Sequence, residues 1–332
     1  MLTKVRFLIY LAAGVLINTA ICHANTSNWS GLIEVESAAL IDNSDTLSSD
    51  ILLATAELGY EHYLDKNTSA NLIFLHEADS TESVEIDHAT INVYDLSGFN
   101  LSMGRQYLPF GSFNSALTSD PLTLELGETR EAAIGLSKSF NLATAEAYFF
   151  QGDMQPAKNA WLPDFMARVS IADEGNISYS IDAYFISELA NSESMSNALG
   201  STEELSHTVS GAGFSALFSM DMLTISAECL GAIKKYSSEN FYNKSPKACH
   251  FEADIAFTLL YKETSIGIGY GLSKDALGFE LPDSRHSVGA TILLTDRISL
   301  TGEWAINSDY SVTEGGSGGS SHALTAQLAM EF

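Results

Sequence analysis

Acidic side chains are the most abundant groups in this sequence that could do chemistry. The 332 residues include 42 Asp and Glu against 16 Lys and Arg, which gives a formal net charge of −26. Because so few bases are available to offset a phosphate backbone, we expect no nucleic-acid partner. Carboxylates in this number would instead concentrate cations and repel anions wherever they line an enclosed space.

Signatures of catalysis and of metal binding are weak. Residues 315–319 match the G-x-S-x-G pattern of a nucleophile elbow, but an elbow needs a strand before it and a helix after it. Here the serine lies in the glycine-rich segment EGGSGGS at 314–320. The eight histidines are scattered singly, with no pair at metal-ligand spacing. We therefore predict no catalytic residues, no cofactor and no metal.

The first residues indicate a secretory signal. Lys4 and Arg6 precede the apolar run 7–17, and small residues follow, so we expect cleavage after Ala24. Cys22 raises a lipoprotein alternative, although Ile21 before it is larger than the residue that lipid attachment prefers. The predicted organisation is a signal peptide at 1–24 and one domain at 25–332.

Residues beyond the signal alternate between apolar and polar types with a period of two. In the last segment Leu324, Leu328 and Phe332 fall on one face, while Thr325 and Gln327 fall on the other. No apolar run reaches the roughly 18 residues that a membrane-spanning helix needs. A chain with this pattern can span a membrane only as a closed barrel. The carboxyl-terminal Phe332 also resembles the signal that barrel-assembly machinery recognises, which makes that machinery an expected partner.

The same alternation predicts sixteen strands. An even number of strands, separated alternately by short turns and long loops, is typical of bacterial outer-membrane barrels. A soluble β-sandwich would also alternate apolar and polar residues, but it has no reason to separate short and long connections by end. We predict an all-β, 16-stranded antiparallel transmembrane barrel in the bacterial outer membrane, porin-like and with no plug domain. Its strands are expected at 29–37, 51–63, 68–77, 84–94, 98–107, 130–139, 142–152, 164–172, 177–187, 206–219, 222–233, 248–261, 264–273, 285–294, 298–307 and 321–332.

Inward positions of these strands carry a surplus of acid. A sixteen-stranded barrel leaves room for an aqueous channel, so such acids predict a lumen that favours cations. For any single residue the alternative is that the acid simply solvates a wet surface. The inward acids are Glu34, Glu36, Glu57, Glu61, Glu146, Asp182, Glu228, Glu252, Asp254 and Glu303, and the expected inward bases are Lys138 and Arg168.

The longest predicted loop, 108–129, contains leucines that an exposed loop would not need. We expect it to fold into the barrel and narrow the pore, which would present Asp120, Glu125 and Glu128 opposite Arg130. In general diffusion porins the loop at this ordinal position forms the constriction, which is an analogy of fold. The alternative is a loop that packs on a neighbouring subunit, and a homotrimer is expected from the same porin analogy.

Two cysteines and a cluster of lysines flank the predicted loop 234–247. Cys229 and Cys249 could form a disulfide in an oxidising compartment. The predicted register, however, places Cys229 near Glu252, about three residues out of line, so a bond requires a shifted register. The lysines at 234, 235, 244 and 247 form a basic patch that could bind lipopolysaccharide phosphates or an anionic ligand, or could simply be solvated.

Several segments resemble the LbtU-type siderophore porin family. They are GLIEVE at 31–36, IDHA at 86–89, GRQYLPFG at 104–111, SDPLTLELGET at 119–129 and AYFFQGD at 147–153. The resemblance implies an outer-membrane barrel of this size that imports an iron–siderophore complex without an energy-coupling apparatus. It assigns no binding residue position by position.

These features together predict a channel that imports a ferric siderophore. Because an acidic lumen would repel an anionic complex, the expected cargo is neutral or cationic. The alternative within transport is a general cation-preferring diffusion porin. Alternatives from other classes are a hydrolase with its catalytic site at the barrel rim and an adhesin that displays its loops.

Overall fold

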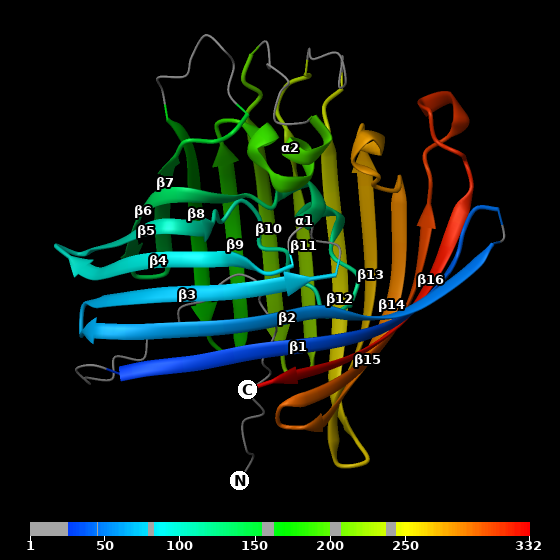
Figure 1. Ribbon diagram of the computed structural model, residues 1–332, viewed down its shortest axis with the longest axis horizontal. Coiled ribbons are helices and arrows are strands. Elements are labelled where there is room, and N and C mark those ends of the chain that lie inside the picture. Colours follow the sequence, from blue (N-terminus) through cyan, green and yellow to red (C-terminus); the bar gives the residue numbers. More distant parts are fainter. Residues whose placement is uncertain (1–25, 45, 79–82, 155–162, 200–206, 237–243) are drawn as a thin grey trace.

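Sixteen antiparallel strands close into one barrel in the computed structural model, as the sequence predicted (Figure 1). The structure describes residues 26–332 except 45, 79–82, 155–162, 200–206 and 237–243. Each strand pairs with its neighbours in sequence, and β1 pairs with β16 to close the ring. The predicted signal peptide at 1–24 lies outside the described residues.

The strands are longer than predicted in several places, most clearly β1 and β2. Their bounds are β1 Thr26–Ile41, β2 Leu47–Asp65, β3 Thr68–Glu77, β4 Glu85–Leu96, β5 Phe99–Tyr107, β6 Arg130–Phe140, β7 Ala143–Phe150, β8 Asp164–Glu174, β9 Ile177–Ile186, β10 Gly211–Met220, β11 Leu223–Ala232, β12 Lys247–Leu259, β13 Lys262–Lys274, β14 Ser284–Thr295, β15 Ile298–Ser308 and β16 Ser320–Glu331.

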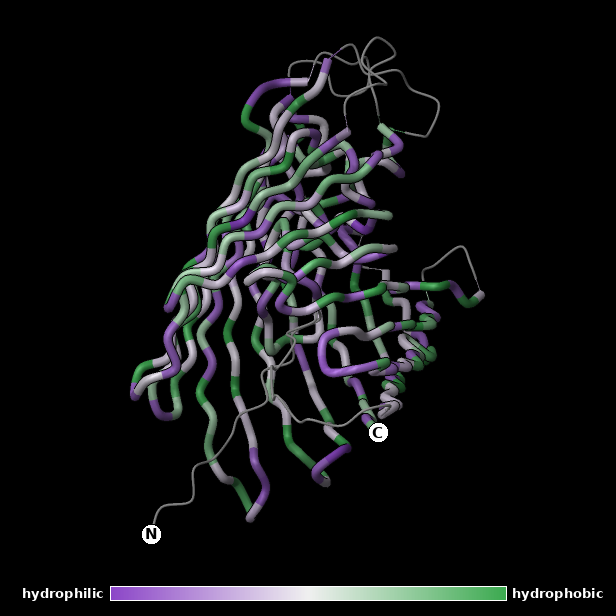
Figure 2. The backbone as a smooth tube through the Cα atoms, turned by 90° about the vertical axis from the view of Figure 1, so that its left-hand side faces the viewer, coloured by the Kyte–Doolittle hydropathy of each residue, from purple (hydrophilic) through white to green (hydrophobic). Residues whose placement is uncertain are grey.

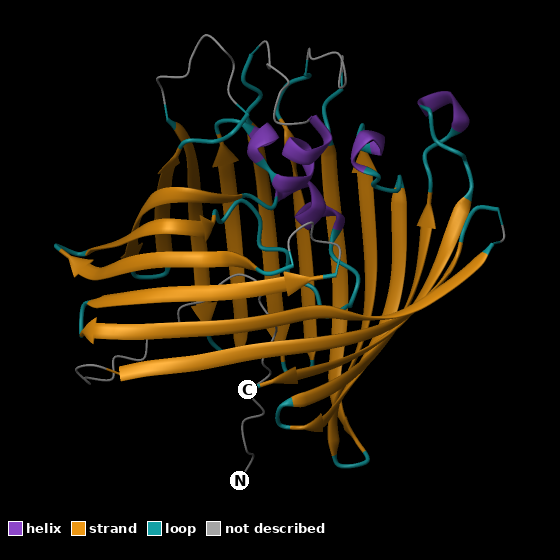
Figure 3. Ribbon diagram, in the orientation of Figure 1, coloured by secondary structure: helices purple, strands orange, loops and turns teal. Residues whose placement is uncertain are grey.

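Helices occupy only the connections at one end of the barrel, within the described part of the chain (Figure 3). They are α1 Leu122–Gly127, α2 Glu193–Leu199 and the 3-10 turns η1 Leu189–Asn191, η2 Leu277–Phe279 and η3 Val312–Glu314. Among the described residues, none of these helices is long and apolar enough to cross a membrane.

The outer surface of the barrel is apolar. Figure 2 shows hydrophobic and hydrophilic residues alternating along the strands. Side chains of one phase, such as Ile268 at 59%, Trp304 at 47% and Leu324 at 60%, remain exposed on the isolated chain. Exposed apolar side chains on every strand of a closed barrel form a surface for lipid. The fold is therefore that of an outer-membrane β-barrel.

The last residue of the chain takes part in closing the barrel. Gly31 donates its amide to the Phe332 carbonyl at 3.0 Å, and Phe332 donates in return to the Gly31 carbonyl at 3.1 Å. A β-carbon at Gly31 would lie 2.2 Å from the Phe332 ring. Position 31 therefore requires glycine for the terminal ring to cover the strand.

Connections at the opposite end to the helices are two-residue turns. One prediction there is wrong, because the turn between β12 and β13 is formed by Leu260 and Tyr261 and not by residues 262–263. Both residues have positive φ, 50° and 65°, as tight hairpin turns require. Tyr261, the last residue of the predicted strand 248–261, is instead 99% exposed at the turn.

Candidate functional site

Loop 108–129 lies inside the barrel, where α1 packs against β11, β12 and β13 (Figure 1). Three of its apolar side chains, Phe110, Leu122 and Leu126, are fully buried. They belong to an apolar cluster that also includes Ile186 at the end of β9 and Leu189 in η1. The leucines that looked out of place in an exposed loop therefore pack against the inner wall and the loops at its end.

Glu228 on β11 holds the start of this loop. Its carboxylate accepts the backbone amides of Ser112 at 2.6 Å and Phe113 at 3.2 Å. It also accepts the hydroxyl of Thr123 in α1 at 2.8 Å. The Glu228 side chain is buried, so the expectation that it lines the open pore is wrong. Its charge is satisfied by the loop because a buried carboxylate needs hydrogen-bond donors.

Two more inward acids hold the middle of the loop. Glu252 on β12 accepts the Ala116 amide at 2.6 Å and the Ser115 hydroxyl at 2.7 Å. It also lies 3.0 Å from the ring of its neighbour His250.

Glu303 on β15 accepts the backbone amides of Thr118 at 2.5 Å and Ser119 at 2.9 Å, together with both of their hydroxyl groups. Glu228, Glu252 and Glu303, which we call the anchor carboxylates, tie the loop to β11, β12 and β15. Each is 6% exposed or less.

Glycines on the inner wall make room for the side chains of the loop. A β-carbon at Gly269 on β13 would lie 2.6 Å from Leu117, and one at Gly289 on β14 would lie 2.8 Å from it. A β-carbon at Gly271 would lie 2.9 Å from Leu122. These glycines form a groove that seats two leucines of the loop, so the anchors and the groove together fix the loop against the wall from β11 to β15. We call this the loop-bearing wall.

Arg285 on β14 is a base beside the loop that the sequence analysis missed. Its guanidinium donates to the Asp120 backbone carbonyl at 2.8 Å and to the Asn307 side chain at 2.8 Å. Arg285 could have been found, because it begins the predicted strand 285–294 on the same phase as Ser287 and Gly289.

Arg130 has other partners than those predicted. Its guanidinium bonds to Glu85 at 2.9 Å, Asp87 at 2.6 Å and Glu193 of α2 at 2.9 Å. The sequence analysis placed Arg130 opposite the acids of the loop, and its ion pairs within the described residues are instead with acids of β4 and α2. The strand pairing explains the difference, because Arg130 lies opposite Tyr107, whose hydroxyl also bonds to Asp87.

The acids of the loop differ in exposure. Asp120 is exposed, whereas Glu125 and Glu128 are half-buried. Burial raises the pKa of the Glu128 carboxyl to about 8, and the neighbouring carboxylate of Glu193 adds to the rise. At neutral pH Glu128 therefore contributes little of the negative charge that the sequence analysis assigned to it.

Two more predicted lumen acids are engaged by a base on the wall. Arg168 on β8 donates to Asp182 on β9 at 2.7 Å and to Glu146 on β7 at 3.2 Å. Asp182 also accepts the Ser180 hydroxyl at 2.8 Å. These three residues form a bridge across neighbouring strands, in which the Arg168 guanidinium offsets one of the two negative charges.

Lys138 was predicted to point into the lumen, and this prediction is wrong. Its ammonium lies 4.4 Å from the ring centroid of Phe99 and 5.4 Å from that of Phe140, which is 54% exposed on the outer surface. Lys138 shares its strand phase with the exposed Ile134 and Leu136. It therefore belongs to the outer face, where a long stem packs on apolar surface and the charge stays at the edge.

Acids on β1 and β2 have different surroundings. Glu34 alternates with the exposed Ile33 and Val35, and Glu57 precedes the exposed Leu58, so both carboxylates point inward. Glu36 accepts a hydrogen bond from Gln327 on β16 at 2.8 Å. Within the described residues, no ion pair of 4 Å or less includes Glu34, Glu36 or Glu57.

This acidic surface faces the start of the loop across the lumen, where Ser112 bonds to Tyr184 on β9 and Ser215 on β10. Its other edge is two strands from β15, which carries Glu303. In a ring of sixteen strands β1 is halfway round from β9, and β2 is halfway round from β10. We call the inner surface of β1 and β2, with Glu34, Glu36, Glu57 and Glu61, the facing wall. The interior therefore carries the anchored loop on β11 to β15 and half-buried carboxylates on β1 and β2.

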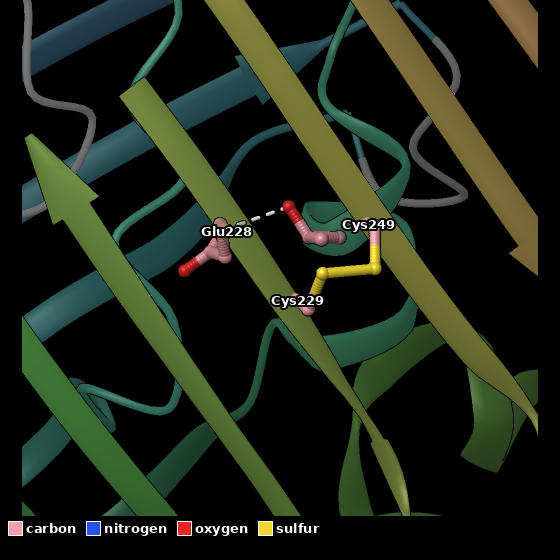
Figure 4. Close-up of a disulfide and its surroundings, with 4 residues drawn as sticks. Glu228, Cys229 and Cys249 are labelled. Atoms are coloured by element: carbon pink, nitrogen blue, oxygen red, sulfur yellow. Dashed lines mark hydrogen bonds between the residues drawn. A yellow bond between two sulfur atoms is a disulfide. The ribbon is translucent and has the colours of Figure 1, made fainter. Parts of the chain in front are cut away.

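A disulfide joins Cys229 to Cys249 between β11 and β12, next to Glu228 in the chain (Figure 4). The two cysteines lie directly opposite each other in the strand register. The predicted register, which placed Cys229 near Glu252, is wrong. The actual pairing puts Ser226 opposite Glu252, so no shift is needed for the bond.

The described residues contain no group of three or more His, Cys, Asp or Glu side chains placed to hold a metal ion. The serine of the G-x-S-x-G pattern, Ser317, follows the short turn η3 and accepts a hydrogen bond from Asn43 at 2.7 Å. A loop of this kind is not a strand-to-helix elbow.

The barrel and its inner loop place the chain in the structural class of outer-membrane porins. It superposes on an anion-selective porin from Comamonas acidovorans with a TM-score of 0.66 and 14% identity, over 93% of this chain and 100% of that one. The channel DcaP of Acinetobacter baumannii gives 0.64 at 13% identity, over 96% and 100%. OmpF of Salmonella typhi, in a complex with daunomycin, gives 0.64 at 10% identity, over 93% and 98%.

Proteins that are similar to this chain in sequence are named UPF0422 proteins. A UPF0422 protein of Coxiella burnetii is 36% identical over 220 residues, which are 62% of this chain and 47% of that protein. A UPF0422 protein of Legionella pneumophila strain Lens is 23% identical over 323 residues, 85% of this chain and 59% of that protein. The chain thus spans about half to three fifths of these relatives. No family model matches the chain.

Proposed function

We propose that this chain is a passive channel that lets small neutral or cationic solutes cross the outer membrane. The observation that carries the proposal is the path of loop 108–129, which three buried carboxylates hold against the inner wall. We expect a loop fixed in this way to narrow the lumen and to leave a passage along the strands that it does not contact.

The facing wall supports a preference for cations. Glu34, Glu36 and Glu57 lie on adjacent strands with no ion-pair partner among the described residues. Carboxylates in a narrow, partly desolvated lumen attract cations more strongly than the same groups on an open surface. Arg285 adds a positive charge beside the loop, where it donates to the Asp120 carbonyl.

Conductance tests this proposal directly. We expect the refolded protein to give open channels in planar bilayers, with a reversal potential of the sign for cation preference under a salt gradient. Neutralising the facing wall with Glu34→Gln and Glu57→Gln should reduce that preference while channels still form. Glu174→Gln is the matched control, because it removes the same charge type at the exposed end of β8. An anion-selective or non-conducting wild type would contradict the proposal.

Import of a ferric siderophore is the narrower hypothesis, and the resemblance to the LbtU-type family favours it. Two segments that carry this resemblance, 104–111 and 119–129, form the end of β5 and much of the inner loop. A family whose likeness is concentrated at the narrowest part of a channel would recognise its cargo there. The acids of the facing wall favour a neutral or cationic complex over an anionic one.

Channel block separates the specific importer from a general porin. A specific importer should show saturable block of ion current by submillimolar neutral or cationic ferric siderophore and no block by the iron-free ligand. A general diffusion porin should pass sugars and amino acids of similar size without saturable block. Cross-linking of the membrane-embedded protein would test the homotrimer that we propose from porin analogy.

A further inference from the structure

Five lysines surround one cavity at the loop end of β11, β12 and β13. The cavity has a volume of about 610 Å³ and is lined by Ile233, Lys234, Lys235, Lys244, Ser245, Lys247, Lys274 and Asp275. These five account for nearly a third of the 16 basic residues in a chain that has 42 acids. Such a concentration of positive charge indicates a site for a polyanion.

The lysines lie on the side of the barrel that meets lipid. Lys247 and Lys274 are directly opposite each other across β12 and β13. Each shares its strand phase with exposed apolar side chains, Lys247 with Phe251 at 42% and Lys274 with Leu272 at 37%. Both ammonium groups therefore extend from the outer surface just beyond the apolar belt, on the side of the long loops.

This position corresponds to the headgroup layer of the outer leaflet. Long loops of outer-membrane barrels face the outside of the cell, and the lipid headgroups begin where the apolar belt ends. The step from Leu272 to Lys274 is two residues of strand, about 7 Å. A lipid whose acyl chains lie on the apolar belt would thus place its headgroup between these two lysines.

Two of the lysines at the cavity, Lys247 and Lys274, form no ion pair of 4 Å or less within the described residues. Asp275 is the one acid among the described lining residues, and it forms an ion pair with Lys244 at 3.6 Å. The same carboxylate accepts the Ser245 amide at 3.1 Å. Lys247 and Lys274 therefore remain available to bind a phosphate group as point charges.

The frame of the cavity is fixed by covalent and backbone bonds. The Cys229–Cys249 disulfide joins the two strands from which the lysine-bearing segments leave (Figure 4). Ala232 donates its amide to the Pro246 carbonyl at 2.9 Å, and Tyr236 donates to the Lys244 carbonyl at 2.8 Å. The buried Tyr236 ring holds this segment against the barrel end. Lys247 and Lys274 are therefore presented from paired strands, which reduces the entropy lost on binding.

We propose that this lysine cavity binds the phosphates of outer-leaflet lipopolysaccharide, with the acyl chains lying on the apolar surface of β12 and β13. Lysine ammonium groups bind phosphate as point charges, and the cavity offers several within one site. Lipid binding at this cavity is independent of what the channel transports. It assigns to this face of the barrel a lipid site that would orient the protein in an asymmetric membrane.

Binding of defined lipids tests the site. The folded protein in detergent micelles would be titrated with diphosphoryl lipid A, with lipid A stripped of phosphate and with inorganic pyrophosphate, and binding followed by native mass spectrometry. We expect diphosphoryl lipid A to bind and the dephosphorylated lipid to bind far more weakly. Pyrophosphate that binds as tightly as lipid A would contradict the lipid assignment and indicate a soluble anion instead.

Matched lysine variants locate the site. Lys247→Gln with Lys274→Gln should weaken diphosphoryl lipid A about thirtyfold, since each lysine near a charged lipid surface contributes a factor of about five. Lys66→Gln with Lys262→Gln removes the same charge at the opposite end of the barrel and should leave binding unchanged. The arginine pair Lys247→Arg with Lys274→Arg should retain binding. Equal affinities in the two glutamine variants, both folded by heat-modifiable gel mobility, would overturn the proposal.

Discussion

The loop-bearing wall and the facing wall both carry carboxylates on the inward phase of their strands, yet these acids have different surroundings. Glu228 and Glu303 are buried and accept several donors from loop 108–129. Glu34 and Glu57 are half-buried, with no ion-pair partner among the described residues. Strand phase therefore decides which acids point inward. The path of the loop decides which of these carboxylates are bound to loop donors and which remain exposed to a solute in the lumen.

Release of the loop should have the largest effect on the channel. Glu303→Ala removes the acceptor for two backbone amides and two hydroxyl groups at Thr118 and Ser119. Leaving such donors unpaired should cost about 3 kcal/mol in the free energy of unfolding. We expect larger single-channel conductance and passage of larger uncharged solutes, measured in bilayers and by liposome swelling. Glu303→Gln, which keeps one acceptor oxygen, should be milder, and unchanged conductance in the alanine variant would show that the loop is held by other contacts.

Filling the glycine groove should displace the loop more modestly. Gly269→Ala would bring a β-carbon to 2.6 Å from Leu117. Overpacking of this kind costs about 1 to 3 kcal/mol, and the same loop movement should raise conductance. Gly302→Ala on β15 is the matched control, because a β-carbon there meets nothing within 4 Å. Equal thermal stabilities for the two alanine variants would argue against a tightly seated leucine.

Glu128 should make stability depend on pH in a defined direction. Burial raises its pKa in the folded protein from 4.5 to about 8, so the folded state holds the proton more tightly than the unfolded state. Its contribution to stability is therefore full below pH 4.5 and is lost as the pH rises toward about 8. Unfolding midpoints of wild type and Glu128→Gln, measured from pH 4 to 9, should diverge over this window.

Glu188 is the control for that measurement. It lies between β9 and η1, and burial raises the pKa of its carboxyl to about 7. Glu188→Gln should remove a separate part of the pH dependence and leave the part from Glu128 in place. If Glu128→Gln has the same pH profile as wild type, then the Glu128 carboxyl is not protonated in the folded protein.

Alternation along the chain was sufficient to predict the strands, because a period of two is a local property. It predicted sixteen of them and the shared apolar face of Leu324 and Leu328, which are both exposed on the outer surface. It failed at the turn of Leu260 and Tyr261, where left-handed backbone is adopted by residues that do not favour it. The sequence analysis also placed Lys138 on the inner face because it is charged, although Ile134 and Leu136 on the same strand phase face lipid.

The site was harder to predict, because its contacts join distant parts of the chain. Glu228 meets Ser112 across 116 residues, and Glu303 meets Thr118 across 185. No local pattern distinguishes these acids from Glu34 or Glu57, which have the same type and phase. The leucines in loop 108–129 and the inward glycines of β13 were visible in the sequence, but only the fold shows that one set seats in the other.

The comparison of the two walls is tested most directly by ion selectivity. Reversal potentials under a salt gradient would be measured for wild type, for Glu34→Gln with Glu57→Gln, and for Glu228→Gln. We predict that the facing-wall variant loses most of its preference for cations at nearly unchanged conductance. The anchor variant should keep the sign of that preference, because the Glu228 charge is satisfied by the loop. A large loss of selectivity in Glu228→Gln, with none in the facing-wall variant, would contradict the account.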